Sequence, residues 1–108
     1  MQKIALVLSL LLISGANASG DNMEESLKIA KSFCSTNAEC IDILSLQLDG
    51  AYEDGVRASK SKSKSEWNVL INRKTKQLNN LCDKAPNTEI CFDYRNRLLE
   101  QYMRGLTN

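Results

Sequence analysis

The sequence predicts an all-α fold, a small four-helix protein built of two αα-hairpins and cross-linked by two disulfides. Apolar residues recur every three to four positions along nearly all of the chain after its first eighteen residues, which is the period of an amphipathic helix. Four cysteines form two local pairs, C-x5-C and C-x8-C, each close to the expected end of a helix. The one proline of the chain, Pro86, lies in the second of these turns.

The first eighteen residues, MQKIALVLSLLLISGANA, have the pattern of a secretory signal peptide. A single cationic residue, Lys3, precedes an apolar run that is too short for an ordinary membrane span, and Ala16-Asn17-Ala18 has the form of a cleavage site. We therefore expect cleavage after Ala18, a mature single domain over 19–108 and a location in the periplasm. An oxidising compartment of this kind lets disulfides persist.

Four helices are expected in the mature chain. Capping boxes at Thr36-x-x-Glu39 and Ser63-x-x-Glu66 predict two helix starts. The serine- and lysine-rich stretch 57–65 predicts a solvated basic linker between the two hairpins. Gly50 and Gly55 weaken the later turns of the second helix, and Gly105 marks the end of the fourth. The expected helices span about 23–34, 37–56, 64–82 and 88–105.

The two halves of the mature chain share an order of residues. In both CSTNAECID (34–42) and CDKAPNTEICFD (82–93), a helix end and a cysteine precede a turn, Asn-x-Glu, a second cysteine and an aspartate. This repeat favours the local disulfides Cys34–Cys40 and Cys82–Cys91. Sequence alone leaves all three possible connectivities open, including pairing between the two turns.

Charge is divided unevenly along the chain. Residues 19–56 hold eight acidic and two basic side chains, whereas residues 57–81 hold seven basic and one acidic, and the mature chain is close to neutral. The two halves can pair with each other or orient a charged partner. The near-zero net charge and the expected export argue against a nucleic-acid partner.

The composition argues against catalysis. The chain has no histidine, which excludes an imidazole base, a Ser-His or Cys-His nucleophile and a His-ligated metal. Carboxylates such as Glu24, Asp49 and Glu53 fit helix N-termini or a polar helix face better than a glycosidase site. We expect no enzyme, no cofactor and no metal. Aromatic and arginine residues, the types that dominate protein interfaces, are the remaining candidates for function.

The mature chain resembles the LprI-like family of small bacterial envelope proteins, named for a lysozyme inhibitor. The shared order runs through Cys34, Glu39, Cys40, Leu48-Asp49, Tyr52, Trp67, Arg73, Cys82, Cys91, Tyr94-Arg95 and Arg97-Leu98. The first cysteine pair is closer, and the Trp67–Arg73 interval longer, than in that family. The resemblance implies a partner-binding surface made of Trp67, Arg73, Tyr94, Arg95 and Arg97.

A second resemblance is local. CSTNAECI (34–41) is similar to a Cys-Ser-x-x-x-Glu-Cys-Ile segment of the RI antiholin of T-even phages, a periplasmic helical protein that delays lysis. In the antiholin this segment lies near the C-terminus, whereas two further helices are expected after it here.

Both resemblances imply a non-catalytic periplasmic protein that binds and restrains a lytic protein of the cell envelope. The expected partner is a lytic enzyme, a holin or a toxin, so the alternatives are a lysozyme-inhibitor-like protein, an antiholin and an immunity protein. The alternative from another class is a structural or chaperone-like accessory of an envelope assembly. Sequence does not decide the oligomeric state.

Overall fold

The computed structural model describes residues 22–108, and this part of the chain is built of helices without a strand. The predicted all-α class, with four helices and two disulfides, is confirmed. The predicted signal peptide (1–18) lies outside the described residues and stays a prediction. The elements are a helix over 22–34, α2 (Ala38–Ser61), the 3-10 turn η1 (Lys64–Glu66), α3 (Trp67–Leu78), the 3-10 turn η2 (Asn79–Cys82) and α4 (Thr88–Thr107).

Each long helix begins at an asparagine cap. The Cys40 backbone N–H donates to Asn37 Oδ1 at 3.0 Å, and the Ile90 N–H donates to Asn87 Oδ1 at 3.0 Å. The expected capping box at Thr36 is therefore wrong by one residue. Threonine and asparagine are both good N-caps, so local sequence does not choose between such neighbours. The second expected box is confirmed, because the Ser63 N–H donates to Glu66 Oε1.

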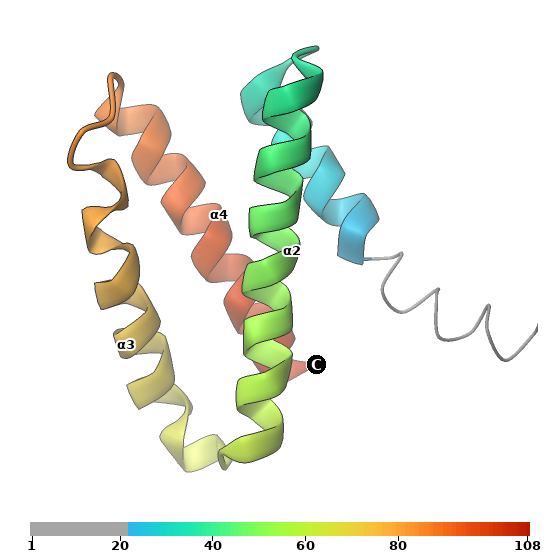
Figure 1. The fold of residues 1–108 in the computed structure, drawn as a ribbon. Helices are drawn as coiled ribbons and strands as arrows, with labels where there is room; N and C mark the ends of the chain where they lie inside the picture. The colour runs from blue at the N-terminus through green and yellow to red at the C-terminus, as the bar shows by residue number, and fades with distance from the viewer. Residues whose placement is uncertain (1–21) are drawn as a thin grey trace, which may run out of the picture.

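The helices α2 and α4 run side by side in the same direction. Figure 1 shows both starting at the upper end of the molecule, with the 22–34 helix and α3 running the opposite way. Each hairpin thus pairs one of these antiparallel helices with α2 or α4. The α2–α4 contact forms the centre of the fold and buries Leu48, Ala51, Tyr94 and Leu98 together with Ala30 of the first helix.

A second core cluster lies near the C-terminal ends of α2 and α4. It consists of Leu70 from α3 with Tyr102 and Leu106 from α4, and Ala58 of α2 packs against it. This burial explains why α2 continues through residues 57–61, which were expected to belong to the linker. The connection outside regular helix is only Lys62 and Ser63.

Gly105 does not end α4, as had been expected, but lies inside it against α2. A Cβ at Gly105 would overlap the carbonyl oxygen of Tyr52, and a Cβ at Gly55 would overlap the carbonyl oxygen of Tyr102. Both glycines are required because the two backbones touch at this crossing.

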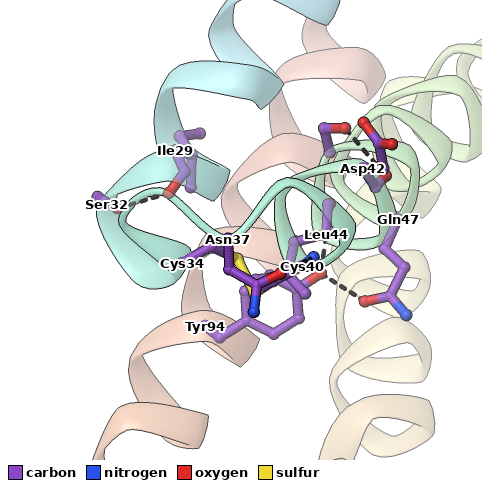
Figure 2. The surroundings of a disulfide bond; sticks show 10 residues. Ile29, Ser32, Cys34, Asn37, Cys40, Asp42, Leu44, Gln47 and Tyr94 are labelled. Carbon is purple, nitrogen blue, oxygen red and sulfur yellow. Dashed lines mark hydrogen bonds between the residues drawn. A yellow bond between two sulfur atoms is a disulfide. The ribbon is translucent and has the colours of Figure 1, made fainter.

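The disulfides join Cys34 to Cys40 and Cys82 to Cys91, each with a Cα–Cα distance of 5.6 Å. This is the connectivity that the repeated sequence favoured. Each bond links the end of one helix to the first turn of the next, and so holds one hairpin corner. Figure 2 shows the corner of Cys34 and Cys40.

Candidate functional site

A groove runs between α2 and α3, with α4 as its floor. In Figure 1 these two helices meet at the lower end of the molecule and diverge upward. The groove consists of two adjoining hollows of about 560 Å³ and 320 Å³ that share Asp54 and Lys74. Its lining residues, hereafter the α2–α3 groove, are Gln47, Gly50, Ala51, Glu53, Asp54, Arg57, Leu70, Arg73, Lys74, Gln77, Leu78, Leu81, Leu98 and Tyr102.

An ion pair crosses the groove. Lys74 Nζ of α3 lies 3.2 Å from Asp54 Oδ2 of α2, and the Lys74 side chain is only 16% exposed. The same ammonium lies 5.0 Å from the centre of the Tyr102 ring. Asp54 also pairs with Arg57 one turn further along α2. These contacts tie the separated helices together where the two hollows meet.

The floor residue Tyr102 responds to this charged setting. Burial raises the pKa of its phenol, and the Asp54 carboxylate raises it further, while Arg73 acts in the opposite direction. A phenol is neutral near neutral pH even at its ordinary pKa, so the floor itself adds no charge.

The end of the groove beyond the ion pair is largely apolar. Ala51, Leu78, Leu81 and Leu98 line this hollow together with the polar Gln47 and Glu53, and Gly50 leaves the α2 backbone open toward it. Apolar side chains continue this face of α2 toward its N-terminus, since Leu46 and Ile43 precede Gly50 by four and seven residues. They are 64% and 48% exposed. Together they form an apolar strip with no covering element among the described residues.

The other end of the groove, hereafter the cationic end, carries Arg73 of α3 and Arg57 of α2, and Lys60 follows Arg57 by one turn on α2. Arg57 is paired with Asp54. Lys76 lies one turn from Arg73 in the opposite direction, toward Leu78, and lines a separate hollow with Val69 and Asn72. Within residues 22–108, Lys60, Arg73 and Lys76 have no carboxylate within 4.0 Å, and the same holds for Lys62 and Lys64. The uneven charge predicted from sequence is therefore only partly compensated inside the fold.

Two of the five predicted contact residues lie on α3. Arg73 is exposed and lines the α2–α3 groove. Trp67 packs against the cluster of Leu70 and Tyr102, with Lys64 Nζ 5.8 Å from its ring centre. Its Nε1 is buried and has no hydrogen-bond partner.

The other three predicted contact residues lie on α4 and point in different directions. Tyr94 is in the core, where its hydroxyl donates to Gln47 Oε1 at 2.5 Å (Figure 2). Its ring meets the Phe33 ring edge-on. Arg95 stacks over Phe92, and Arg97 pairs with Glu100 at 3.1 Å. The five residues therefore do not form one surface, because residues two apart on a helix point in different directions.

A smaller hollow lies between the two disulfide corners. Phe33, Leu44, Pro86 and Ile90 are among its lining residues, and none of the eight is charged. It offers apolar contact without a group that would orient a partner. The α2–α3 groove combines apolar and charged walls and is the stronger candidate site. The sequence predictions did not include this groove, although Ile43, Leu46 and Gly50 fall on one face of the expected second helix.

Within the described residues, no cluster of three or more histidine, cysteine, aspartate or glutamate side chains is arranged to hold a metal ion. None of the helices over 22–108 is long and apolar enough to cross a membrane.

The chain matches a protein-family model. The model of the valyl-tRNA ligase modifier family covers residues 1–108, the whole chain. No curated protein and no solved structure is significantly similar to it.

This match overturns several sequence predictions. The chain is not assigned to the lysozyme-inhibitor family or to the antiholins, and a description that names a tRNA ligase contradicts the periplasmic location. It also contradicts a lytic enzyme, holin or toxin as partner, and with it the roles of lysis inhibitor, antiholin, immunity protein and envelope accessory. The resemblances relied on the order of cysteines, acidic residues and aromatics, which disulfide-linked helical hairpins produce by themselves. The chain belongs to the valyl-tRNA ligase modifier family.

Proposed function

We propose that this chain is a non-catalytic binding protein that associates with a valyl-tRNA ligase in the cytoplasm and thereby modifies its properties. The observation that carries the proposal is the family match over the entire chain, because the description of the family names valyl-tRNA ligase as what its members modify. The association is proposed to be non-covalent, so that the modification is a change in conformation or stability of the ligase.

The chemistry of the chain supports binding over catalysis. A covalent modifier needs an activated nucleophile or a general base, and catalytic groups of this kind usually have perturbed pKa values. In the described residues the groups with shifted pKa values are Tyr94 and Tyr102, and burial is the main cause in both. The four cysteines are paired in disulfides in the structure, and the chain has no histidine that could activate a thiol as a nucleophile.

The architecture supports the same proposal. Tertiary contacts hold the α2–α3 groove, because Leu70 of α3 packs with Tyr102 of α4 and Lys74 of α3 pairs with Asp54 of α2. A preformed surface loses little conformational entropy on association. Of the five contact residues predicted from sequence, Arg73 is retained as a proposed contact because it lines this groove.

The test uses the full chain and valyl-tRNA ligase purified from the cells in which the chain is expressed. Sedimentation velocity measures complex formation, and a ligase for another amino acid is the matched control. Intact-mass spectrometry of the ligase after incubation measures covalent change. We expect a complex with the valyl enzyme alone and an unchanged ligase mass. An increase in the mass of the ligase would show that the chain modifies the enzyme covalently and would refute the non-catalytic role. The absence of a complex would refute the proposed association.

A further inference from the structure

The glycines of α2 and α4 provide the starting point. Gly55 and Gly105 are explained by the α2–α4 crossing, where a Cβ would overlap backbone atoms. Gly50 is different, because a Cβ at this position would meet no atom within 4 Å. A glycine in the middle of a helix lowers helix stability relative to alanine, and no contact within the described residues requires this one.

Close approach of another backbone is a common reason for a glycine on a helix surface. Gly50 is exposed and lines the apolar end of the α2–α3 groove. A side chain at this position would project into the groove and keep a partner away from α2. The absence of a side chain at Gly50 thus leaves the α2 backbone accessible at this point of the groove.

We infer that the α2–α3 groove receives a helix of the valyl-tRNA ligase, with apolar side chains over Gly50 and carboxylates at the cationic end. This inference rests on the proposed function for the identity of the partner.

The shape and backbone chemistry of the groove favour a helical occupant. Its α2 wall extends from Gln47 to Arg57, about 15 Å or nearly three turns at 1.5 Å per residue. The walls and floor are helices whose backbone groups bond internally, so an extended peptide would find no strand edge to pair with. A helix satisfies its own backbone and presents a side-chain stripe at the same spacing as the groove.

Charge complementarity fixes the chemistry of the occupant. Apolar residues line the Gly50 end, namely Ala51, Leu78 and Leu81, and Leu46 extends this end along α2. At the other end Arg73 lacks a carboxylate partner among the described residues. The complementary helix presents apolar side chains toward Gly50 and a carboxylate toward Arg73, an arrangement that also sets its direction in the groove.

The first test fills the groove at Gly50. The Gly50→Phe variant adds a large ring where the fold leaves space, so the chain folds and the ring obstructs the occupant. We expect affinity for the purified ligase, measured by isothermal titration calorimetry, to fall at least about tenfold. The control is Asn96→Phe, which places the same ring on an exposed position of α4, two residues from the groove residue Leu98 and on another side of the helix. Circular dichroism checks that both variants remain helical.

The second test reverses one charge at the cationic end. Arg73→Glu should weaken binding roughly tenfold and reduce its dependence on salt, because a favourable contact becomes a repulsive one. The matched control, Arg97→Glu, reverses another exposed arginine, on α4, that already pairs with Glu100. We expect its affinity to stay within about twofold of the wild type.

The outcomes separate the two proposals. If the wild-type chain binds the ligase and Gly50→Phe binds equally well, the groove assignment is wrong and the proposed function stands. If the wild-type chain does not bind, both fail. Self-association of the chain, or binding of isolated tRNA, that Gly50→Phe abolishes while ligase binding persists would assign the groove to a second copy or to RNA and overturn the inference.

Discussion

Gly55 and Gly105 occupy equivalent positions on α2 and α4, and each allows the other helix to approach. The backbone of Tyr102 fills the space beside Gly55, and the backbone of Tyr52 fills the space beside Gly105. Each glycine follows its own tyrosine by three residues, and the two tyrosines are fifty residues apart, as are the caps Asn37 and Asn87. The helices α2 and α4 therefore contribute matching residues to their crossing.

We expect Gly55→Ala to destabilise the fold by about 3 kcal/mol, at the upper end of the usual range for overpacking. The atoms in the way are backbone atoms, which cannot move aside as a flexible side chain does. Gly105→Ala should have a similar effect. In the double variant the loss should be less than the sum, since one substitution already separates the helices. Urea denaturation measures all three, and full additivity would contradict a shared crossing.

Gly50→Ala is the internal control for this series. Because a Cβ there meets nothing in the fold, the substitution should raise the free energy of unfolding by up to about 1 kcal/mol through helix propensity alone. A destabilising Gly50→Ala would show that the glycine serves the isolated fold and would weaken the argument for an external occupant.

We expect Tyr94 to make the free energy of unfolding decrease with pH in the alkaline range. Burial raises the pKa of its phenol above the ordinary value of 10.0. Below pH 10 the phenol is neutral in both states, and its favourable contribution is fully present. Above pH 10 the unfolded chain releases the proton while the folded chain retains it, so stability decreases by about 1.4 kcal/mol per pH unit from this group.

Urea denaturation between pH 9 and pH 11 tests this dependence. Tyr94→Phe should lose about 1 kcal/mol near neutral pH, because the hydrogen bond to Gln47 is removed, and should show a shallower decline above pH 10. The comparison with wild type cancels the titration of the lysines. Parallel curves for the two proteins would exclude Tyr94 as the source.

Removing the Cys82–Cys91 disulfide should lower the free energy of unfolding by about 2 kcal/mol in the chain-entropy picture, given its short loop. Cys82→Ser with Cys91→Ala tests this, and the equivalent pair at Cys34 and Cys40 should behave alike. Thermal denaturation with and without reductant gives the same comparison in the wild type. Identical melting under both conditions would show that the corners hold without the bonds.

The Asp54–Lys74 pair should contribute more than an ordinary surface pair, because Lys74 is mostly buried. In a double-mutant cycle with Asp54→Asn and Lys74→Met we expect a coupling of about 1 kcal/mol, at the top of the range for exposed pairs. The exposed pair Arg97–Glu100 provides the reference, with an expected coupling of about 0.3 kcal/mol. Equal couplings would show that the groove contact is an ordinary surface interaction.

Local signals were sufficient for much of the fold. The helical period, the Ser63–Glu66 box and the cysteine spacing predicted the all-α class, the start of the third helix and the favoured disulfides. The sequence was less informative where neighbouring residues were equally suitable for the same structural role, or where distant contacts decided the structure. Thr36 and Asn37 are both suitable caps, and residues 57–61 are helical because Ala58 packs against α4 residues almost fifty positions away.

The site was harder to predict for a related reason. Trp67, Arg73, Tyr94, Arg95 and Arg97 were grouped by their order along the chain, yet Tyr94 is in the core and the arginines point to different sides. The groove depends on the separation between α2 and α3, and this separation cannot be predicted from the sequence of either helix alone. The function could not be inferred from spacing, because hairpins that are built in the same way serve unrelated partners.

The sequence by itself determined that this chain is helical and where its corners lie, since helix formation, capping and short-range disulfides act between residues near one another in the chain. Only the tertiary structure decided what the glycines do. Gly50, Gly55 and Gly105 are alike as helix-weakening residues, but two lie at the α2–α4 crossing and one lies open in the groove. The distance between helices depends on the side chains that meet from distant parts of the sequence, and only the packed fold brings those together.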